Sequence, residues 1–253
     1  MSPNEVVLRI RARFASFGLY ETSLLGTLTS CSSWATAAHD CVVAASGIPV
    51  VSFASRSVHP SVAGQVDYSA YVGGCSAVSS LIGGKLTQTT PSGTMPHSLV
   101  LIMGETVRAA LAFDRHMEKN VPRVVLIDTF KDEVEEAIQV GKAMKETLRG
   151  IRIETPVERG GITPNLVDEI NKKLEGEQIT GCDIYVSGDM NPDDIKQFVE
   201  NKSAVAGFAI DNYIARGSKI NFRADIKEIE GKAIARRGRI PGMNISSRLD
   251  RIF

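Results

Sequence analysis

The chain has 253 residues, of which 43% are hydrophobic, and its 29 Lys and Arg residues balance its 29 Asp and Glu residues. This length is enough to bury a substantial core in one domain of barrel or doubly wound type, and a net charge of zero provides no field that attracts nucleic acid or a membrane. The four scattered cysteines indicate a reducing compartment without disulfides or a zinc site, and no apolar run is long enough to span a bilayer, so we expect a cytoplasmic protein.

Strand-like and helical patterns alternate along the chain. An amphipathic stretch over 6–14 precedes a run of small and apolar residues that predicts a buried helix over 21–45. Short β-rich runs follow at 49–53, 123–127, 151–153, 183–186 and 205–210. Helical patterns lie between several of them, at 99–117, 132–148, 165–174 and 192–200. Repeated β-α units imply parallel strands with right-handed crossovers, but the periodicity does not separate an open sheet from a barrel.

The last part of the chain has a different pattern. Residues 220–240 predict a strand, a turn and a second strand, with the turn at Glu230-Gly231-Lys232. Neither repeats nor low-complexity linkers interrupt the sequence, so we expect a single domain over residues 1–253.

Small residues lie next to side chains that can bind anions in three neighbouring segments. These segments are Phe-Ala-Ser-Arg-Ser-Val-His-Pro at 53–60, Gly-Gly at 73–74 and Pro-Ser-Gly-Thr-Met-Pro-His-Ser at 91–98. Backbone N–H groups left accessible by small residues, with Arg or His beside them, bind phosphate or carboxylate. The three segments therefore predict an anionic, phosphorylated substrate.

Polar residues also follow several of the predicted strands. Arg56, Asp128, Thr155 and the pair Ser187-Gly188 each come soon after a β-rich run. Barrels and doubly wound sheets place their active sites at this end of the strands. A helix cap is an equally good interpretation of Asp128 taken alone, but the recurrence of such positions favours a site.

Five motifs run in the order found in nicotinate phosphoribosyltransferases, and the chain resembles the archaeal members of that family. They are Leu-Tyr-Glu-Thr-Ser-Leu-Leu-Gly (19–26), Ser-Arg-Ser-Val-His-Pro (55–60), Gly-Thr-Met-Pro-His-Ser (93–98), Leu-Ile-Asp-Thr (126–129) and Val-Ser-Gly-Asp-Met (186–190). The third is the most specific. The resemblance implies an irregular type II phosphoribosyltransferase α/β barrel with parallel strands and a C-terminal β-hairpin. Its parts would be leading helices (1–46), a barrel core (47–218), and the hairpin and tail (219–253).

The same resemblance implies an activity. Family members join nicotinate to phosphoribosyl pyrophosphate, which gives nicotinate mononucleotide and pyrophosphate in NAD salvage. Mg²⁺ is the implied cofactor, and ATP is a co-substrate hydrolysed through a transient phosphohistidine. The family's N-terminal domain and C-terminal extension find no match in this sequence. The implied partner is therefore a second copy of the chain or a separately encoded N-terminal domain.

Residue roles follow from the resemblance as well. His97 matches the phosphorylated histidine, and Asp128 matches the acidic residue near the ribose and Mg²⁺. Arg56 matches an arginine that contacts the pyridine carboxylate or a phosphate, which suits the planar guanidinium fork. The other implied substrate-binding residues are Thr94, Arg159, Ser187, Gly188 and Asn212. An exposed ion pair is an equally good interpretation of Arg159.

Two further interpretations of the resemblance stay open. One is a non-catalytic, truncated homologue that acts as a binding subunit. The other is a decarboxylating quinolinate phosphoribosyltransferase, although the second carboxylate of quinolinate calls for extra basic residues. A further expectation concerns Asp211, which lies where relatives carry a glycine-rich phosphate loop. A carboxylate at that position is expected to repel phosphate.

Overall fold

The computed structural model describes residues 2 and 4–252. The chain divides into two compact units, one formed by Cys31–Lys219 and the other by Met1–Ser30 together with Ile220–Phe253. Among the described residues, no helix combines the length and the apolar character that a membrane crossing requires.

The larger unit contains a six-stranded parallel sheet. Its strands are β1 (Val50–Ser52), β2 (Ala77–Val78), β3 (Val124–Leu126), β4 (Gly150–Ile153), β5 (Asp183–Gly188) and β6 (Gly207–Ile210). The order β2-β1-β6-β5-β4-β3 is that of a sequential barrel opened between β2 and β3. The predicted α/β barrel of parallel strands is confirmed, and most strands lie within a few residues of their predicted ranges. Strand β2 was not predicted.

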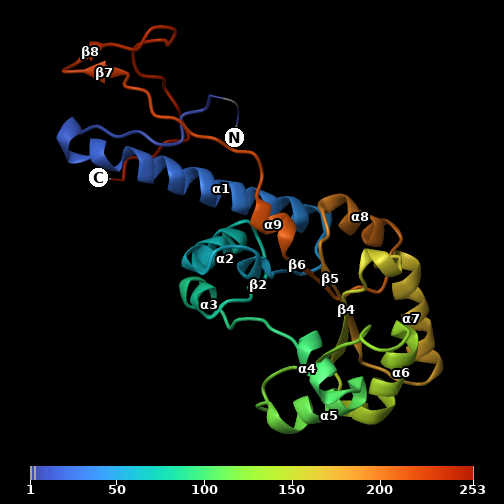
Figure 1. Cartoon of the computed structure of the whole chain (residues 1–253). Coiled ribbons are helices and arrows are strands. Elements are labelled where there is room, and N and C mark those ends of the chain that lie inside the picture. The colour runs from blue at the N-terminus through green and yellow to red at the C-terminus, as the bar shows by residue number, and fades with distance from the viewer. Residues whose placement is uncertain (1, 3, 253) are drawn as a thin grey trace. The chain divides into compact units, whose positions relative to one another are not determined.

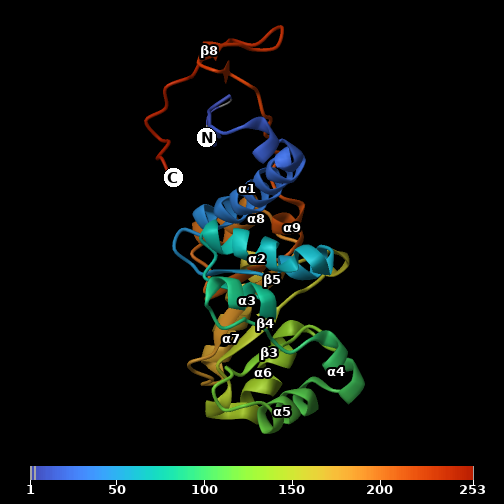
Figure 2. The ribbon, with the colours of Figure 1, turned by 90° about the vertical axis from the view of Figure 1, so that its left-hand side faces the viewer.

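Helices pack around this sheet (Figures 1 and 2), and of the first of them, α1, the part from Cys31 onward belongs to this unit. They are α1 (Glu21–Ala44), α2 (Ala63–Val72), α3 (Leu81–Thr87), α4 (His97–Met103), α5 (Thr106–His116), α6 (Glu133–Met144), α7 (Pro164–Gly176), α8 (Pro192–Glu200) and α9 (Asn212–Arg216). Helices α2 and α3 pack together and contact β2, while α6 packs against both α5 and α7. The single helix expected over 99–117 is two helices, because Gly104 ends α4 with a φ of 75°.

Capping residues set the start of α8, the helix whose predicted bounds match the structure at both ends. The Asn191 side chain accepts hydrogen bonds from the backbone N–H groups of Asp193 and Asp194, and the Asp194 carboxylate accepts the N–H of Asn191. Pro192 occupies the first helical position, where its missing N–H costs nothing. A reciprocal capping box of this kind is readable from sequence because it depends only on local residues.

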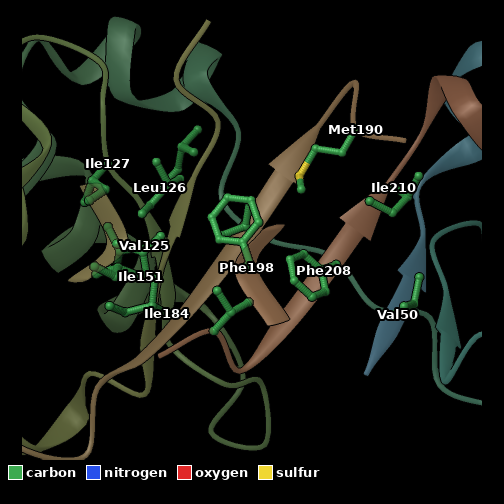
Figure 3. Close-up of a cluster of buried hydrophobic side chains, with 14 of the residues drawn as sticks. Val50, Val125, Leu126, Ile127, Ile151, Ile184, Met190, Phe198, Phe208 and Ile210 are labelled. Carbon is green, nitrogen blue, oxygen red and sulfur yellow. The ribbon is translucent and has the colours of Figure 1, made fainter. Parts of the chain in front are cut away.

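The core lies on the strands and the helices that cover them (Figure 3). Strands β4 and β6 are buried at every position, as expected of parallel strands covered on both faces. Phe198 of α8 meets Phe208 of β6 edge to face, with ring centroids 5.9 Å apart. This continuous apolar interior fixes the strand ends, and therefore the loops that follow them.

The smaller unit contains the predicted β-hairpin. Strands β7 (Glu228–Ile229) and β8 (Lys232–Ala233) pair antiparallel. The two residues between them, Glu230 and Gly231, have φ values of 49° and 79°, the positive values that a tight type I′ turn requires. The amphipathic stretch over 6–14 is irregular until a 3₁₀ helix begins at Phe14.

Candidate active site

Parallel strands all end at one edge of the sheet, so the loops that follow them meet there. The loops after β1, β3 and β4 carry Arg56, Asp128 and Glu154, and the loop after β6 carries Asp211. Hydrogen bonds connect all four of these residues, as described below. Of the polar residues that were predicted after the strands, Arg56 and Asp128 belong to this group, whereas the Thr155 hydroxyl donates to Glu133 instead.

His97 and Asp128 form a close pair. His97 is the first residue of α4, and its Nε2 lies 2.8 Å from Oδ1 of Asp128. Oδ2 of Asp128 accepts the backbone N–H of Glu154. Burial raises the pKa of Asp128 above its ordinary 3.8, while the hydrogen bonds from His97 and Glu154 oppose that rise. An ionised carboxylate only accepts, so in a neutral His97 that donates to Asp128 the proton lies on Nε2 and the lone pair on Nδ1.

Arg56 joins two acidic residues from different loops. It lies in the 3₁₀ turn Ala54–Ser57, directly after β1. Its Nε donates to Oδ2 of Asp211 at 3.0 Å, and its Nη2 donates to Oε1 of Glu154 at 3.2 Å. The hydrogen bond to Asp211 raises the pKa of Arg56. The Arg56 side chain is 60% exposed, so part of the guanidinium remains accessible to a ligand.

Arg152 and Glu154 also belong to this arrangement, and neither residue was predicted from the sequence. Arg152 is a buried residue of β4 that donates to the Ser187 hydroxyl at 2.7 Å and to the Glu154 carboxylate. Burial alone would raise the pKa of Glu154, but the positive charges of Arg152 and Arg56 outweigh it and leave that pKa lowered. Glu154 therefore stays ionised between two guanidinium groups.

A cleft of about 320 Å³ opens beside these groups. Its lining combines hydroxyls, a glycine and charged side chains, namely Phe53, Ser55, Arg56, Ser79, Ser92, Gly93, Thr94, Pro96, Arg152 and Glu154. The volume lies at the lower end of the range of small-molecule sites. Hydroxyls next to a guanidinium are suited to bind a phosphorylated or carboxylated ligand.

The other predicted substrate-binding residues are distributed around this centre. Thr94 lines the cleft. Ser187 is buried behind it, and its hydroxyl donates to the carbonyl of Ile153. Gly188 has a φ of 126°, and a Cβ added there would lie 3.7 Å from Cγ of Glu154. Asn212 begins α9 and accepts a hydrogen bond from the Ser57 hydroxyl at 2.9 Å.

Arg159 is separate from the group. It ends the 3₁₀ helix Val157–Arg159, is exposed, and does not line the cleft. Asp211 belongs to the group, because it is 2% exposed and its carboxylate faces Arg56 instead of open solvent. The charge that was expected to repel phosphate is thus balanced by a guanidinium.

The signal for Arg152 and Glu154 is visible in the sequence Ile-Arg-Ile-Glu-Thr at 151–155. A charged residue in the middle of a buried strand needs a partner, and an acidic residue two positions later is the nearest candidate. The partner of Arg56 could not be found this way, since Arg56 and Asp211 are 155 positions apart.

The acidic side chains also bear on the expected Mg²⁺. Among the residues the structure describes, no three His, Cys, Asp or Glu side chains cluster closely enough to hold a metal ion by themselves. The Glu154 carboxylate lines the cleft, and the Asp128 carboxylate lies behind it, hydrogen-bonded to the Glu154 N–H. Mg²⁺ is commonly held by one or two carboxylates together with substrate phosphates and waters. The donor set fits an ion that arrives with a phosphorylated substrate, and does not fit an all-protein metal site.

Comparisons with known proteins place this chain in a family. The family described as "Quinolinate phosphoribosyl transferase, C-terminal domain" matches residues 34–216. Two proteins of Mycobacterium tuberculosis named nicotinate phosphoribosyltransferase are 26% and 28% identical, over 82% and 83% of this chain and 44% and 46% of their own lengths. The chain thus spans less than half the length of these curated relatives.

Solved structures give the same picture of the fold. A nicotinate-nucleotide pyrophosphorylase from Pyrococcus furiosus is 38% identical, with a TM-score of 0.86 over 91% of this chain and 58% of its own. The human nicotinic acid phosphoribosyltransferase is 16% identical with a TM-score of 0.57, which bears on the fold alone. With 183 of 253 residues inside the family match (34–216), the chain belongs to the quinolinate phosphoribosyl transferase C-terminal domain family, within the type II phosphoribosyltransferases.

Proposed function

We propose that the chain is the catalytic domain of a phosphoribosyltransferase that joins nicotinate to phosphoribosyl pyrophosphate and gives nicotinate mononucleotide and pyrophosphate. The observation that carries the proposal is the hydrogen-bonded series from His97 through Asp128 and Glu154 to Arg56 at one edge of the sheet. The family match and the cleft beside this series support it.

The charges of the cleft favour a substrate with one carboxylate. Arg56 and Arg152 are the two guanidiniums of its lining, and both already contact Glu154. Only Arg56 is substantially exposed, so one guanidinium fork is available to the pyridine acid. Quinolinate, with two carboxylates, is the second candidate, because the description of the matched family names it.

The reaction needs positioning and charge neutralisation more than covalent chemistry on the sugar. The pyridine nitrogen forms a bond to the anomeric carbon while the bond from that carbon to the pyrophosphate oxygen breaks. The hydroxyls of Ser55, Ser79, Ser92 and Thr94 would donate to phosphate oxygens. Asp128 and Glu154 would hold Mg²⁺ together with the pyrophosphate, and the ion would neutralise charge on the leaving group.

His97 is suited to accept a phosphoryl group from ATP. With Nε2–H donated to Asp128, the lone pair on Nδ1 is the nucleophile. Bond formation from Nδ1 to the γ-phosphorus breaks the bond to the bridging oxygen, and ADP leaves. The Asp128 carboxylate stabilises the positive charge that develops on the ring. A phosphohistidine beside the cleft would then alter how pyrophosphate is held.

Partners are part of the proposal, because the resemblance to nicotinate phosphoribosyltransferases implies them. The partner would be a second copy of the chain or a separately encoded N-terminal domain, which would contribute to the pyridine site. Arg159 would contact pyrophosphate only if a ligand or partner reaches its exposed position. A non-catalytic binding subunit is the alternative role for the same fold.

The test is an assay with labelled pyridine acids. Purified chain is incubated with phosphoribosyl pyrophosphate and Mg²⁺, with either nicotinate or quinolinate, in the presence and absence of ATP. The proposal predicts nicotinate mononucleotide, with higher yield when ATP is present, and loss of product in the Arg56→Met variant. Carbon dioxide release from quinolinate without use of nicotinate would overturn the substrate assignment. Absence of product from both acids, with or without the separately encoded domain, would favour the binding subunit.

A further inference from the structure

The loop after β3 folds around a carboxylate that belongs to the chain itself. Four successive backbone N–H groups, from Asp128 to Lys131, donate to the side chain of Glu136. Oε2 accepts those of Asp128 and Thr129 at 3.0 and 3.2 Å, and Oε1 accepts those of Phe130 and Lys131 at 3.0 and 3.2 Å. Successive amides that converge in this way form an anion-binding concavity.

The side chain of Glu136 is itself fixed by burial and by a further hydrogen bond. It lies in the first turn of α6, is 1% exposed, and also accepts the Thr106 hydroxyl at 2.8 Å. These five donors are all uncharged groups, and the Lys131 ammonium adds a Coulombic attraction to the same carboxylate. Charge-assisted hydrogen bonds are about twice as strong as neutral ones, so this carboxylate fixes the loop more strongly than an amide could.

The loop needs such support because its first residue is strained. Asp128 has a φ of 87°, in the left-handed region that side chains other than glycine rarely adopt. A residue in that region persists only where its surroundings over-determine it. The backbone direction at this residue decides where its carboxylate points, and that carboxylate meets His97 and the Glu154 N–H.

We propose that Glu136 is a positioning residue for the reaction, which holds Asp128 in its strained conformation and thereby orients His97. The inference rests on the proposed function only in treating the His97–Asp128 pair as catalytic. Glu136 itself lies outside the cleft lining and acts through Asp128.

The test replaces Glu136 with Gln, which keeps the shape but leaves one oxygen for the donors and turns an NH₂ group toward the amides. Glu133→Gln is the matched control. Glu133 is also buried in the first turn of α6, at 4% exposure, but the hydrogen bond described for it comes from the Thr155 hydroxyl. Circular dichroism and thermal unfolding establish that each variant is folded.

The decisive readout is the ¹⁵N spectrum of His97, one of four histidines and assignable by His97→Gln. Wild type is expected to show one tautomer with the proton on Nε2, and so is Glu133→Gln. Glu136→Gln is expected to show a mixture of tautomers. An unchanged His97 spectrum in a folded Glu136→Gln protein would overturn the inference.

Turnover provides the second readout. If the protein joins nicotinate to phosphoribosyl pyrophosphate, Glu136→Gln is expected to lower kcat about 10- to 100-fold with KM for nicotinate changed less than about threefold. Should the chain show no turnover at all, the proposed function fails while the His97 spectrum still decides the role of Glu136. Should Glu136→Gln not fold, Glu136→Asp replaces it, with a partly mixed tautomer expected and an unchanged one contradicting the inference.

Discussion

The pairing of Arg56 with Asp211 gives a prediction whose size follows from the structure. Replacing Arg56 by Met removes the guanidinium but keeps the apolar stem that packs beside the cleft. The Asp211 carboxylate, with its side chain 3% exposed, then retains only the N–H of Asn212 among the donors described for it. An ionised and buried acceptor without its counter-charge destabilises the fold.

The loss of unfolding free energy that Arg56→Met causes lies between two limits. Breaking a fully buried ion pair costs about 3–5 kcal/mol, whereas an exposed pair is worth about 0–1 kcal/mol. Solvent screens the Arg56 side chain, which is 60% exposed, so we expect Arg56→Met to lower the free energy of unfolding by about 1–3 kcal/mol. For a chain of this size that corresponds to a Tm decrease of roughly 2–12 °C.

A double-mutant cycle measures the pairing itself. Urea unfolding is followed for wild type, Arg56→Met, Asp211→Asn and the double variant. The neutral amide that Asp211→Asn introduces no longer needs a counter-charge. In the Asp211→Asn protein, Arg56→Met should therefore lower the free energy of unfolding much less than in wild type. The difference between the two effects is a coupling free energy of about 1–3 kcal/mol. Additive effects within about 0.5 kcal/mol would refute the argument that Arg56 balances the charge of Asp211.

Three further predictions concern Glu154, His97 and Gly83. The folded pKa of Glu154 lies below its ordinary 4.5, so its charge contributes stability that is complete above about pH 5 and is lost as the pH falls through the lowered pKa. The difference in unfolding free energy between wild type and Glu154→Gln should be largest near pH 7 and shrink in acid; a difference independent of pH would contradict this. His97→Ala should abolish ATP stimulation of turnover without loss of the fold, because the side chain is 41% exposed, and unchanged ATP-coupled turnover would remove His97 from the mechanism. Gly83→Ala should lower the free energy of unfolding by about 1–3 kcal/mol, since the new Cβ would lie 2.5 Å from Cβ of Asp67. Gly176→Ala is the control and should not destabilise the protein, because a Cβ there would meet nothing within 4 Å. Equal Tm values for the two variants would argue against the contact with Asp67.

Elements whose signals are local could be predicted from the sequence. The bounds of α8 follow from Asn191 and Pro192, and the hairpin turn follows from Glu230-Gly231. The helices α2 and α3 were missed because small residues give them little periodicity. Gly83 and Gly84 are buried in α3 against side chains of other segments, a packing demand that the local sequence does not display.

Single polar residues that follow a strand could be predicted as candidates for the site. Their hydrogen-bond partners could not be predicted where those partners are distant in sequence. The motifs identified Arg56, His97 and Asp128, and the structure joins them through Glu154. The support that Glu136 gives to Asp128 could not be inferred, because it consists of backbone amides that any residue would supply. Such contacts depend on the path of the chain and leave no pattern in its side chains.

The most direct measurement is a crystal structure of the chain with nicotinate mononucleotide and pyrophosphate. We predict density for the nucleotide in the cleft, with the pyridine carboxylate or a phosphate within hydrogen-bond distance of Arg56 and the ribose on the side of Asp128. A nucleotide bound elsewhere on the molecule, with the cleft filled only by solvent, would contradict the account.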